Sequence, residues 1–168
     1  DAYKSAYSHD SEIVKPGYHK VELDKYKIGV ELTSTARVGM HRYTYPAGEK
    51  ANVLFDVGAL LAHGKTEKAA IHRISSKEIG GCSVLAPTSR RKKPVTVYFV
   101  ARFNQNMTEF GGWEKEGEDK KLVRKNSIEG TDIGGYASFD KLKKQSLLMK
   151  VGISYVSEEQ ARINLNYE

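Results

Sequence analysis

The sequence predicts an all-β protein: an antiparallel β-sandwich with one short C-terminal helix. Alternation of apolar and polar side chains with a period of two recurs along the chain, and clusters of glycine and proline separate the alternating segments. β-branched residues are frequent, and ten tyrosines occur among 168 residues. Many short strands with turn residues between them favour an antiparallel sandwich over a βαβ arrangement.

Seven segments carry the alternation that predicts strands. The three clearest are Ile28–Thr33, Val95–Phe103 and Leu147–Tyr155, in which apolar side chains occupy every second position. The shorter ones are His19–Leu23, Val38–Tyr45, Asn52–Val57 and Ile71–Ser75. Turn chemistry separates the strands, and we interpret these groups as turns: Pro16-Gly17, Asp24-Lys25, Pro46-Ala47-Gly48, Gly80-Gly81, Gly111-Gly112 and Gly134-Gly135.

Two segments interrupt the strand pattern. Ser89–Lys93 is predicted to be a basic loop, and Glu114–Lys125, with its mixed charges, a solvated hairpin or long loop.

One helix is predicted, at the C-terminal end. Ser157-Glu158-Glu159-Gln160 is a capping box, with Ser157 as N-cap and Gln160 at the third helical position. A helix of about ten residues is barely stable alone, so we expect it to lead into something further on. We therefore divide the chain into a β-sandwich domain, residues 1–156, and the start of a helical linker, residues 157–168.

The composition limits the class of protein. Hydrophobic residues are 39% and charged residues 29% of the chain, which permits a packed core in one domain. The formal net charge is +6, and no apolar run approaches the roughly 18 residues that span a membrane, so we expect no membrane span. The chain begins at Asp1 with polar residues and neither an initiator Met nor a signal peptide, so we expect a processed product or an excised piece.

His9 and Glu12 are the first candidate site residues. They belong to a His-Asp-Ser-Glu run whose residue types bind metals or transfer protons. Neighbouring positions of an extended chain point to opposite faces, so we expect these side chains not to converge on one ion. Two interpretations remain: a loop whose side chains cap backbone groups, or a contact to another domain.

His41 and Arg42 are the second pair, inside the strand predicted at Val38–Tyr45. One interpretation is a contact to an anion or a sugar hydroxyl. The other is an outward histidine beside an arginine that stacks on a tyrosine.

Other motifs are weaker. Arg90–Lys93 is a short basic run without interleaved aromatics, which we interpret as a solvated loop. Trp113 is the only tryptophan, and two interpretations remain for it: stacking on a sugar, or packing in the core. Cys82 is the only cysteine, and Asn106-Met107-Thr108 is a glycosylation sequon. No spacing identifies a catalytic residue or a metal ligand, and we expect no nucleic-acid partner.

Three longer segments carry a family resemblance. Tyr7–Leu23 is YSHDSEIVKPGYHKVEL, Ile28–Pro46 is IGVELTSTARVGMHRYTYP, and Lys150–Leu165 is KVGISYVSEEQARINL. In order, these resemble the N-terminal domain of family-92 glycoside hydrolases, the exo-acting α-mannosidases, and Val97–Phe103 resembles its middle strand. The similarity covers nearly the whole chain and is weakest over residues 76–94 and 114–135.

The resemblance implies a function for a larger protein. In that family, an N-terminal β-sandwich (of the supersandwich type) is joined by a helical linker to a C-terminal (α/α)₆ catalytic domain, here the implied partner in the same polypeptide. The family removes terminal mannose from mannose-containing glycans with inversion and requires calcium. The family's acid, base and calcium ligands belong to the C-terminal domain, and none maps onto Asp1–Glu168. The resemblance also implies a periplasmic or secreted location and a bacterial source.

From the resemblance we expect the isolated domain to be inactive, to need no cofactor itself, and to expose an apolar patch where the catalytic domain docks. His9, Glu12, His41 and Arg42 lie in the matching motifs and contact substrate, the partner domain or only their own sheet. Two alternatives remain: a stand-alone carbohydrate-binding module with Trp113 and surface tyrosines as its platform, and a basic interaction domain using Arg90–Lys93.

Overall fold

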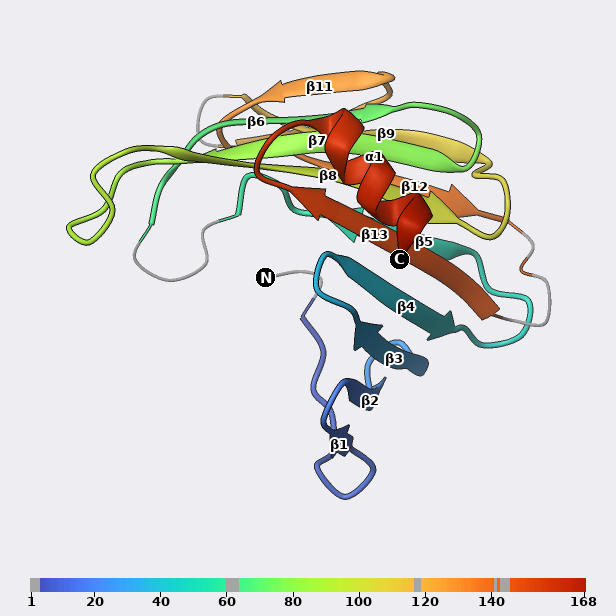
Figure 1. Ribbon diagram of the computed structural model, residues 1–168. Helices are drawn as coiled ribbons and strands as arrows, with labels where there is room; N and C mark the ends of the chain where they lie inside the picture. Colours follow the sequence, from blue (N-terminus) through green and yellow to red (C-terminus); the bar gives the residue numbers. More distant parts are fainter. Residues whose placement is uncertain (1–3, 60–63, 117–118, 141, 143–145) are drawn as a thin grey trace.

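The computed structural model describes residues 4–59, 64–116, 119–140, 142 and 146–168. Within them the chain forms two antiparallel β-sheets and one helix, so the predicted all-β sandwich with a C-terminal helix is confirmed (Figure 1). The strands are β1 (Ile13–Lys15), β2 (Tyr18–Leu23), β3 (Ile28–Ser34), β4 (Val38–Thr44), β5 (Ala51–Phe55), β6 (Thr66–Arg73), β7 (Glu78–Leu85), β8 (Val95–Phe103), β9 (Glu109–Glu116), β10 (Asp119–Val123), β11 (Ser127–Gly130), β12 (Gly134–Phe139) and β13 (Ser146–Ser154). The helix α1 is Glu158–Tyr167.

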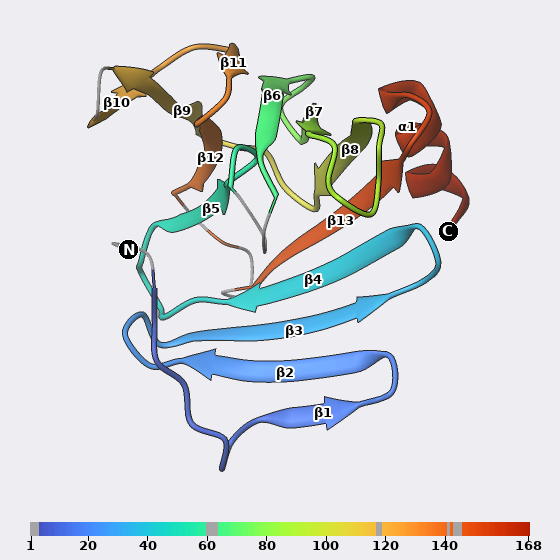
Figure 2. The ribbon, with the colours of Figure 1, turned by 90° about the vertical axis from the view of Figure 1, so that its left-hand side faces the viewer.

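The larger sheet has nine strands in the order β1-β2-β3-β4-β13-β8-β7-β6-β11. The smaller sheet has the order β10-β9-β12-β5. The small sheet and α1 lie on opposite sides of the large sheet (Figure 2). Strands β1–β4, which we call the wing, extend away from the body of the sandwich (Figure 1). The face that the large sheet turns toward the small sheet is called the inner face, and the face that carries α1 is called the outer face.

Phenylalanines join the two sheets. Phe103 on β8 lies 4.9 Å from Phe139 on β12 and 6.3 Å from Phe55 on β5, measured between ring centroids. Phe55 also stacks on Phe99 at 6.0 Å. Buried aliphatic side chains surround these rings, including Ile71, Ile79, Ile128, Ile133 and Leu147. The apolar alternation that predicted β8 therefore supplies the centre of the core.

The glycine pairs are not turns, and this part of the prediction was wrong. Gly80-Gly81 lies within β7, Gly111-Gly112 within β9 and Gly134-Gly135 within β12. A β-carbon at Gly81 or Gly112 would collide with the backbone oxygen of Ala70 or Gly134, respectively. These glycines allow close approach of neighbouring chain, so they mark tight packing inside strands.

The helix begins where its capping residue predicts. Ser157 is extended and its Oγ accepts a hydrogen bond from the Gln160 amide at 3.0 Å. The second half of the predicted capping box is absent, because the Gln160 side chain donates instead to Asn164 Oδ1 at 3.1 Å. Ala161 and Leu165 pack against Gly152 of β13, where the missing side chain lets the helix lie close to the sheet.

Candidate functional site

The inner face of the wing carries a row of side chains from adjacent strands. His19 on β2 is directly opposite Leu32 on β3, and Leu32 is directly opposite His41 on β4. His41 in turn faces Met149 on β13, which faces Phe103. Residues directly opposite each other share a face of the sheet, so the row continues from the buried core onto the wing.

Glu12 connects two histidines at the β2 end of this row. Its carboxylate contacts His9 Nδ1 at 2.6 Å and His19 Nε2 at 2.8 Å. The prediction concerned convergence of the whole run on one ion, which the contact between Glu12 and two histidines does not contradict, but its premise of an extended chain does not hold. Ser8–Ser11 instead forms a turn, with the Ser11 amide donating to the Ser8 carbonyl, and this turn brings His9 and Glu12 together.

The pKa of the Glu12 carboxyl depends on the two histidines that it contacts. Hydrogen bonds from His9 and then His19 hold the pKa of the Glu12 carboxyl below its ordinary value of 4.5. We expect the double variant His9→Ala, His19→Ala to raise the Glu12 pKa toward 4.5, measured by ¹³C NMR of the carboxyl. Glu31, whose pKa is lowered first by Tyr18, is the matched control and should keep its shift. An unchanged Glu12 pKa in the double variant would contradict the role of the two imidazoles.

His41 pairs with an aromatic neighbour on its own strand. Its Nδ1 lies 2.9 Å from Tyr43 Oη, and its ring lies over Gly39, which has no side chain in the way. Burial lowers the pKa of His41 and raises the pKa of Tyr43 to about 12. Both groups are therefore neutral near pH 7, and together they offer hydrogen-bonding atoms without a charge.

Arg42 lies on the opposite face from His41. It contacts Glu31 at 3.3 Å, and Glu31 also accepts a hydrogen bond of 2.7 Å from Tyr18 Oη. The four residues singled out in the sequence therefore do not form one site. His41 shares the inner face with His19, which Glu12 contacts, whereas Arg42 belongs to a Tyr18–Glu31–Arg42 cluster on the outer face. His19 was missed because only the β1–β2 register brings it to Glu12.

The contacts within these clusters are hydrogen bonds and ion pairs. Among the described residues, no group of three His, Cys, Asp or Glu side chains is arranged to hold a metal ion. No helix in the described part of the chain is long and apolar enough to cross a membrane.

Two of the remaining sequence motifs, Trp113 and the basic run, have structural roles. Trp113 is only 8% exposed, and its ring lies against Gly134, so it offers no open face for a sugar. Arg91 donates to the carbonyls of Leu85, Ala86 and Lys93, and so holds the β7–β8 loop together. One of the four basic residues is thus not available to a polyanion. Cys82 is half-buried, and burial raises the pKa of its thiol.

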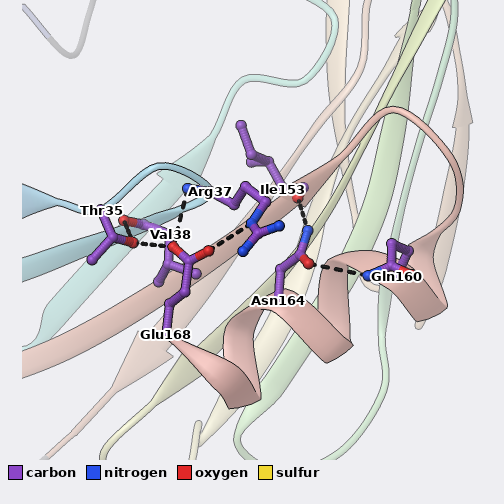
Figure 3. A network of polar contacts seen from close by, with 7 residues as sticks. All are labelled: Thr35, Arg37, Val38, Ile153, Gln160, Asn164 and Glu168. Atoms are coloured by element: carbon purple, nitrogen blue, oxygen red, sulfur yellow. Dashed lines mark hydrogen bonds and ion pairs between the residues drawn. The ribbon is translucent and has the colours of Figure 1, made fainter.

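Hydrogen bonds join the C-terminal helix to the β3–β4 turn and to β13 of the large sheet (Figure 3). The Glu168 carboxylate accepts hydrogen bonds from Thr35 Oγ1 and from Arg37, at 2.6 Å from its Nε and 3.2 Å from its backbone amide. Asn164 Nδ2 donates to the Ile153 carbonyl at 2.9 Å. The end of α1 is thereby fixed to the β3–β4 turn and to β13.

Exposed apolar side chains gather in the same part of the chain. Half of the ten large hydrophobic side chains that the described residues expose belong to residues 153–168, which we call the C-terminal segment. They are Ile153, Tyr155, Val156, Ile163 and Tyr167. Tyr155 is 70% and Tyr167 85% exposed, so this segment presents large apolar side chains to solvent.

A family model and several solved structures relate the chain to the same protein family. The family model described as "Glycosyl hydrolase family 92 N-terminal domain" matches residues 1–154. No curated protein sequence matches the chain.

Solved structures agree with the family match. The chain is similar to the family GH92 α-mannosidase BT3965 from Bacteroides thetaiotaomicron, with 30% identity and a TM-score of 0.85. It is also similar to the GH92 family glycosyl hydrolase ccman5, with 27% identity and a TM-score of 0.81. The fold is shared with the inverting mannosidase BT2199 from Bacteroides thetaiotaomicron, at 20% identity and a TM-score of 0.77. The matches cover 95–98% of this chain but only 21–22% of those chains.

Proposed function

The chain belongs to glycosyl hydrolase family 92, as its N-terminal domain, and from this membership we propose that it is part of an α-mannosidase that removes terminal mannose from glycans. The observation that carries the proposal is the match of residues 1–154 to the family, together with 30% identity to an α-mannosidase over 98% of the chain. That α-mannosidase is also described in complex with mannoimidazole. Hydrolysis with inversion, a calcium requirement and a periplasmic or secreted location belong to the proposal and rest on the family resemblance.

The domain has a supporting role in this proposal. The chain spans about one fifth of the neighbours' length, so the acid, the base and the calcium ligands are assigned to the remainder, a C-terminal (α/α)₆ domain of the same polypeptide. The exposed C-terminal segment supports an interface with that domain, because a large partner would cover Tyr155 and Tyr167. The isolated chain Asp1–Glu168 is then inactive.

The test is to express the whole reading frame that contains this chain. We expect the product to release mannose from α-mannosides, with β-mannose as the first anomer seen by ¹H NMR, as inversion requires. Chelation should abolish the activity, and added calcium should restore it. The isolated chain and an α-glucoside substrate are the controls, and neither should give product. A full-length product that folds but releases no mannose would overturn the proposal.

A substitution in the C-terminal segment tests the interface separately. Ile163 is 51% exposed on α1, so Ile163→Lys should change the stability of the isolated chain by less than about 0.5 kcal/mol. In the full-length protein the same change should lower the midpoint of thermal unfolding, because it buries a charge in the interface. Leu122→Lys, at an exposed position of β10, is the matched control. Equal effects of both variants in the full-length protein would place the interface elsewhere.

A further inference from the structure

A groove lies between the end of the wing and the edge of the small sheet. It has a volume of about 580 Å³ and is bounded by the β2–β3 turn, the segment after β4 and the edge strand β5. Its apolar lining comes from Leu23, Tyr26, Ile28, Pro46 and Leu54. A hollow of this size is in the range that takes a small organic ligand. We call it the junction groove.

Three lysines and one glutamate stand around this apolar lining: Lys25, Lys27, Lys50 and Glu49. Lys25 Nζ lies 5.0 Å from the centre of the Tyr26 ring. Lys50 is within 3.7 Å of Glu109 and 3.5 Å of Asp140, so its charge is partly balanced, whereas no ion pair is recorded for Lys27 among the described residues. The groove is therefore positive at its edge and apolar at its base.

The backbone at Lys27 is the second observation. Lys27 has a φ of 52°, and it is the one non-glycine residue with positive φ in the described part of the chain. Glycine or asparagine adopts this left-handed conformation at lower cost than lysine does. Gly17 and Gly48 occupy the other two positive-φ positions. Lys27, in the turn between β2 and β3, therefore lines the junction groove although its backbone conformation favours glycine.

We propose that the junction groove binds an acidic oligosaccharide, one that carries carboxylates on its sugar rings. A sugar ring presents C–H groups on one face and hydroxyls around its edge, which suits an apolar base surrounded by polar groups. The carboxylate would meet Lys27 and Lys25, and the hydroxyls would meet Asn52 and Glu49. The inference rests on the proposed function, because a domain of a glycan-degrading enzyme encounters such polymers. It concerns a groove separate from the His9, Glu12 and His41 groups.

The test titrates the ¹⁵N-labelled chain with trigalacturonate, an acidic trisaccharide. We expect the backbone amides of residues 23–28 and 45–54 to shift, with an affinity that falls as salt is raised. Mannotriose, which has no charge, should leave these amides in place, and so should a polyglutamate peptide, which has no sugar ring. Comparable shifts with mannotriose or polyglutamate would overturn the proposal, as would no shift with trigalacturonate.

Two variants separate binding from folding. Lys27→Gly removes the charge and relieves the backbone, so it should weaken trigalacturonate binding about tenfold while the midpoint of thermal unfolding stays the same or rises. Leu54→Asp, in the groove, should abolish binding, whereas Leu122→Asp, at a more exposed leucine on β10, should not change it. Unchanged binding by Lys27→Gly would overturn the role of Lys27. These results do not involve mannose release, so failure here and failure of the glycosidase proposal are distinguishable.

Discussion

Glu78→Gln is expected to destabilise the domain by about 1.5–3 kcal/mol, because it removes the charge from two charge-assisted hydrogen bonds to a largely buried carboxylate. The Glu78 carboxylate is only 12% exposed and lies between Arg102 on β8 and Arg162 on α1, with one oxygen accepting from each. Glutamine has the same shape but no charge, so two guanidinium groups would remain close together without a counter-ion. Urea unfolding of the variant and the unmodified chain measures the difference.

The matched control for Glu78 is Glu114→Gln. Glu114 pairs with Lys125 at 2.7 Å, but its side chain is 30% exposed and that of Lys125 is 55% exposed. An ion pair of this kind contributes less than about 1 kcal/mol, because water screens it. Similar losses in the two variants would show that burial does not distinguish the pairs.

The same group gives a pH dependence with a definite sign. Burial opposes ionisation of Glu78, but hydrogen bonds from Arg162 and Arg102 outweigh it and hold the pKa below the ordinary value of 4.5. Its contribution to stability is therefore complete above about pH 5 and is lost as the pH falls through the folded-state pKa. The stability difference between the unmodified chain and Glu78→Gln should accordingly shrink on acidification.

Gly152→Ala should destabilise the domain by about 1–3 kcal/mol and loosen α1. A β-carbon at Gly152 would collide with the Ala161 carbonyl, and it would lie 2.7 Å from Leu165 Cβ and 2.9 Å from the Leu165 amide nitrogen. Two of these contacts are helix backbone, which cannot rotate away, so α1 must move off β13. Urea unfolding should record the loss, and limited proteolysis should cut within Glu158–Tyr167 earlier than in the unmodified chain.

Gly29→Ala is the control for Gly152. A β-carbon there would meet Thr44 Cβ at 3.5 Å, an ordinary contact, and φ at Gly29 is not positive. Alanine at a compatible position restricts the unfolded chain and should be neutral or stabilising by about 0.4–1 kcal/mol. If Gly152→Ala were equally harmless, the close approach of α1 to β13 would be wrong.

The sequence predicted the strands whose alternation was uninterrupted. The bounds of β8, Val95–Phe103, agree residue for residue, and Phe99, Ala101 and Phe103 face the core at every second position. Strand β7 was missed because Gly80 and Gly81 at its centre have the composition of a turn. Only the structure shows that Gly81 is a glycine because Ala70 and Phe99 occupy the space of its side chain. The local sequence around Gly81 does not show which residues of other strands lie next to it.

The candidate site was predictable in residue type but not in arrangement. His9 and Glu12 were selected, yet their contact depends on a turn whose hydrogen bonds come from serines rather than from glycine or proline. His41 and Arg42 were treated as a pair because they are adjacent, but adjacent strand residues point to opposite faces. The junction groove is lined by segments that are distant in the sequence, so no sequence motif predicts it.

The position of β13 has a consequence for synthesis on the ribosome. β13 lies between β4 and β8 in the large sheet, although it follows β4 by about one hundred residues in the chain. At about 5–20 residues per second, the open edge of β4 therefore waits some seconds for its partner while the rest of the sandwich emerges. An unpaired strand edge of this kind can pair with other nascent chains. The synthesis of β13 therefore determines when the wing, β1–β4, is protected from such pairing.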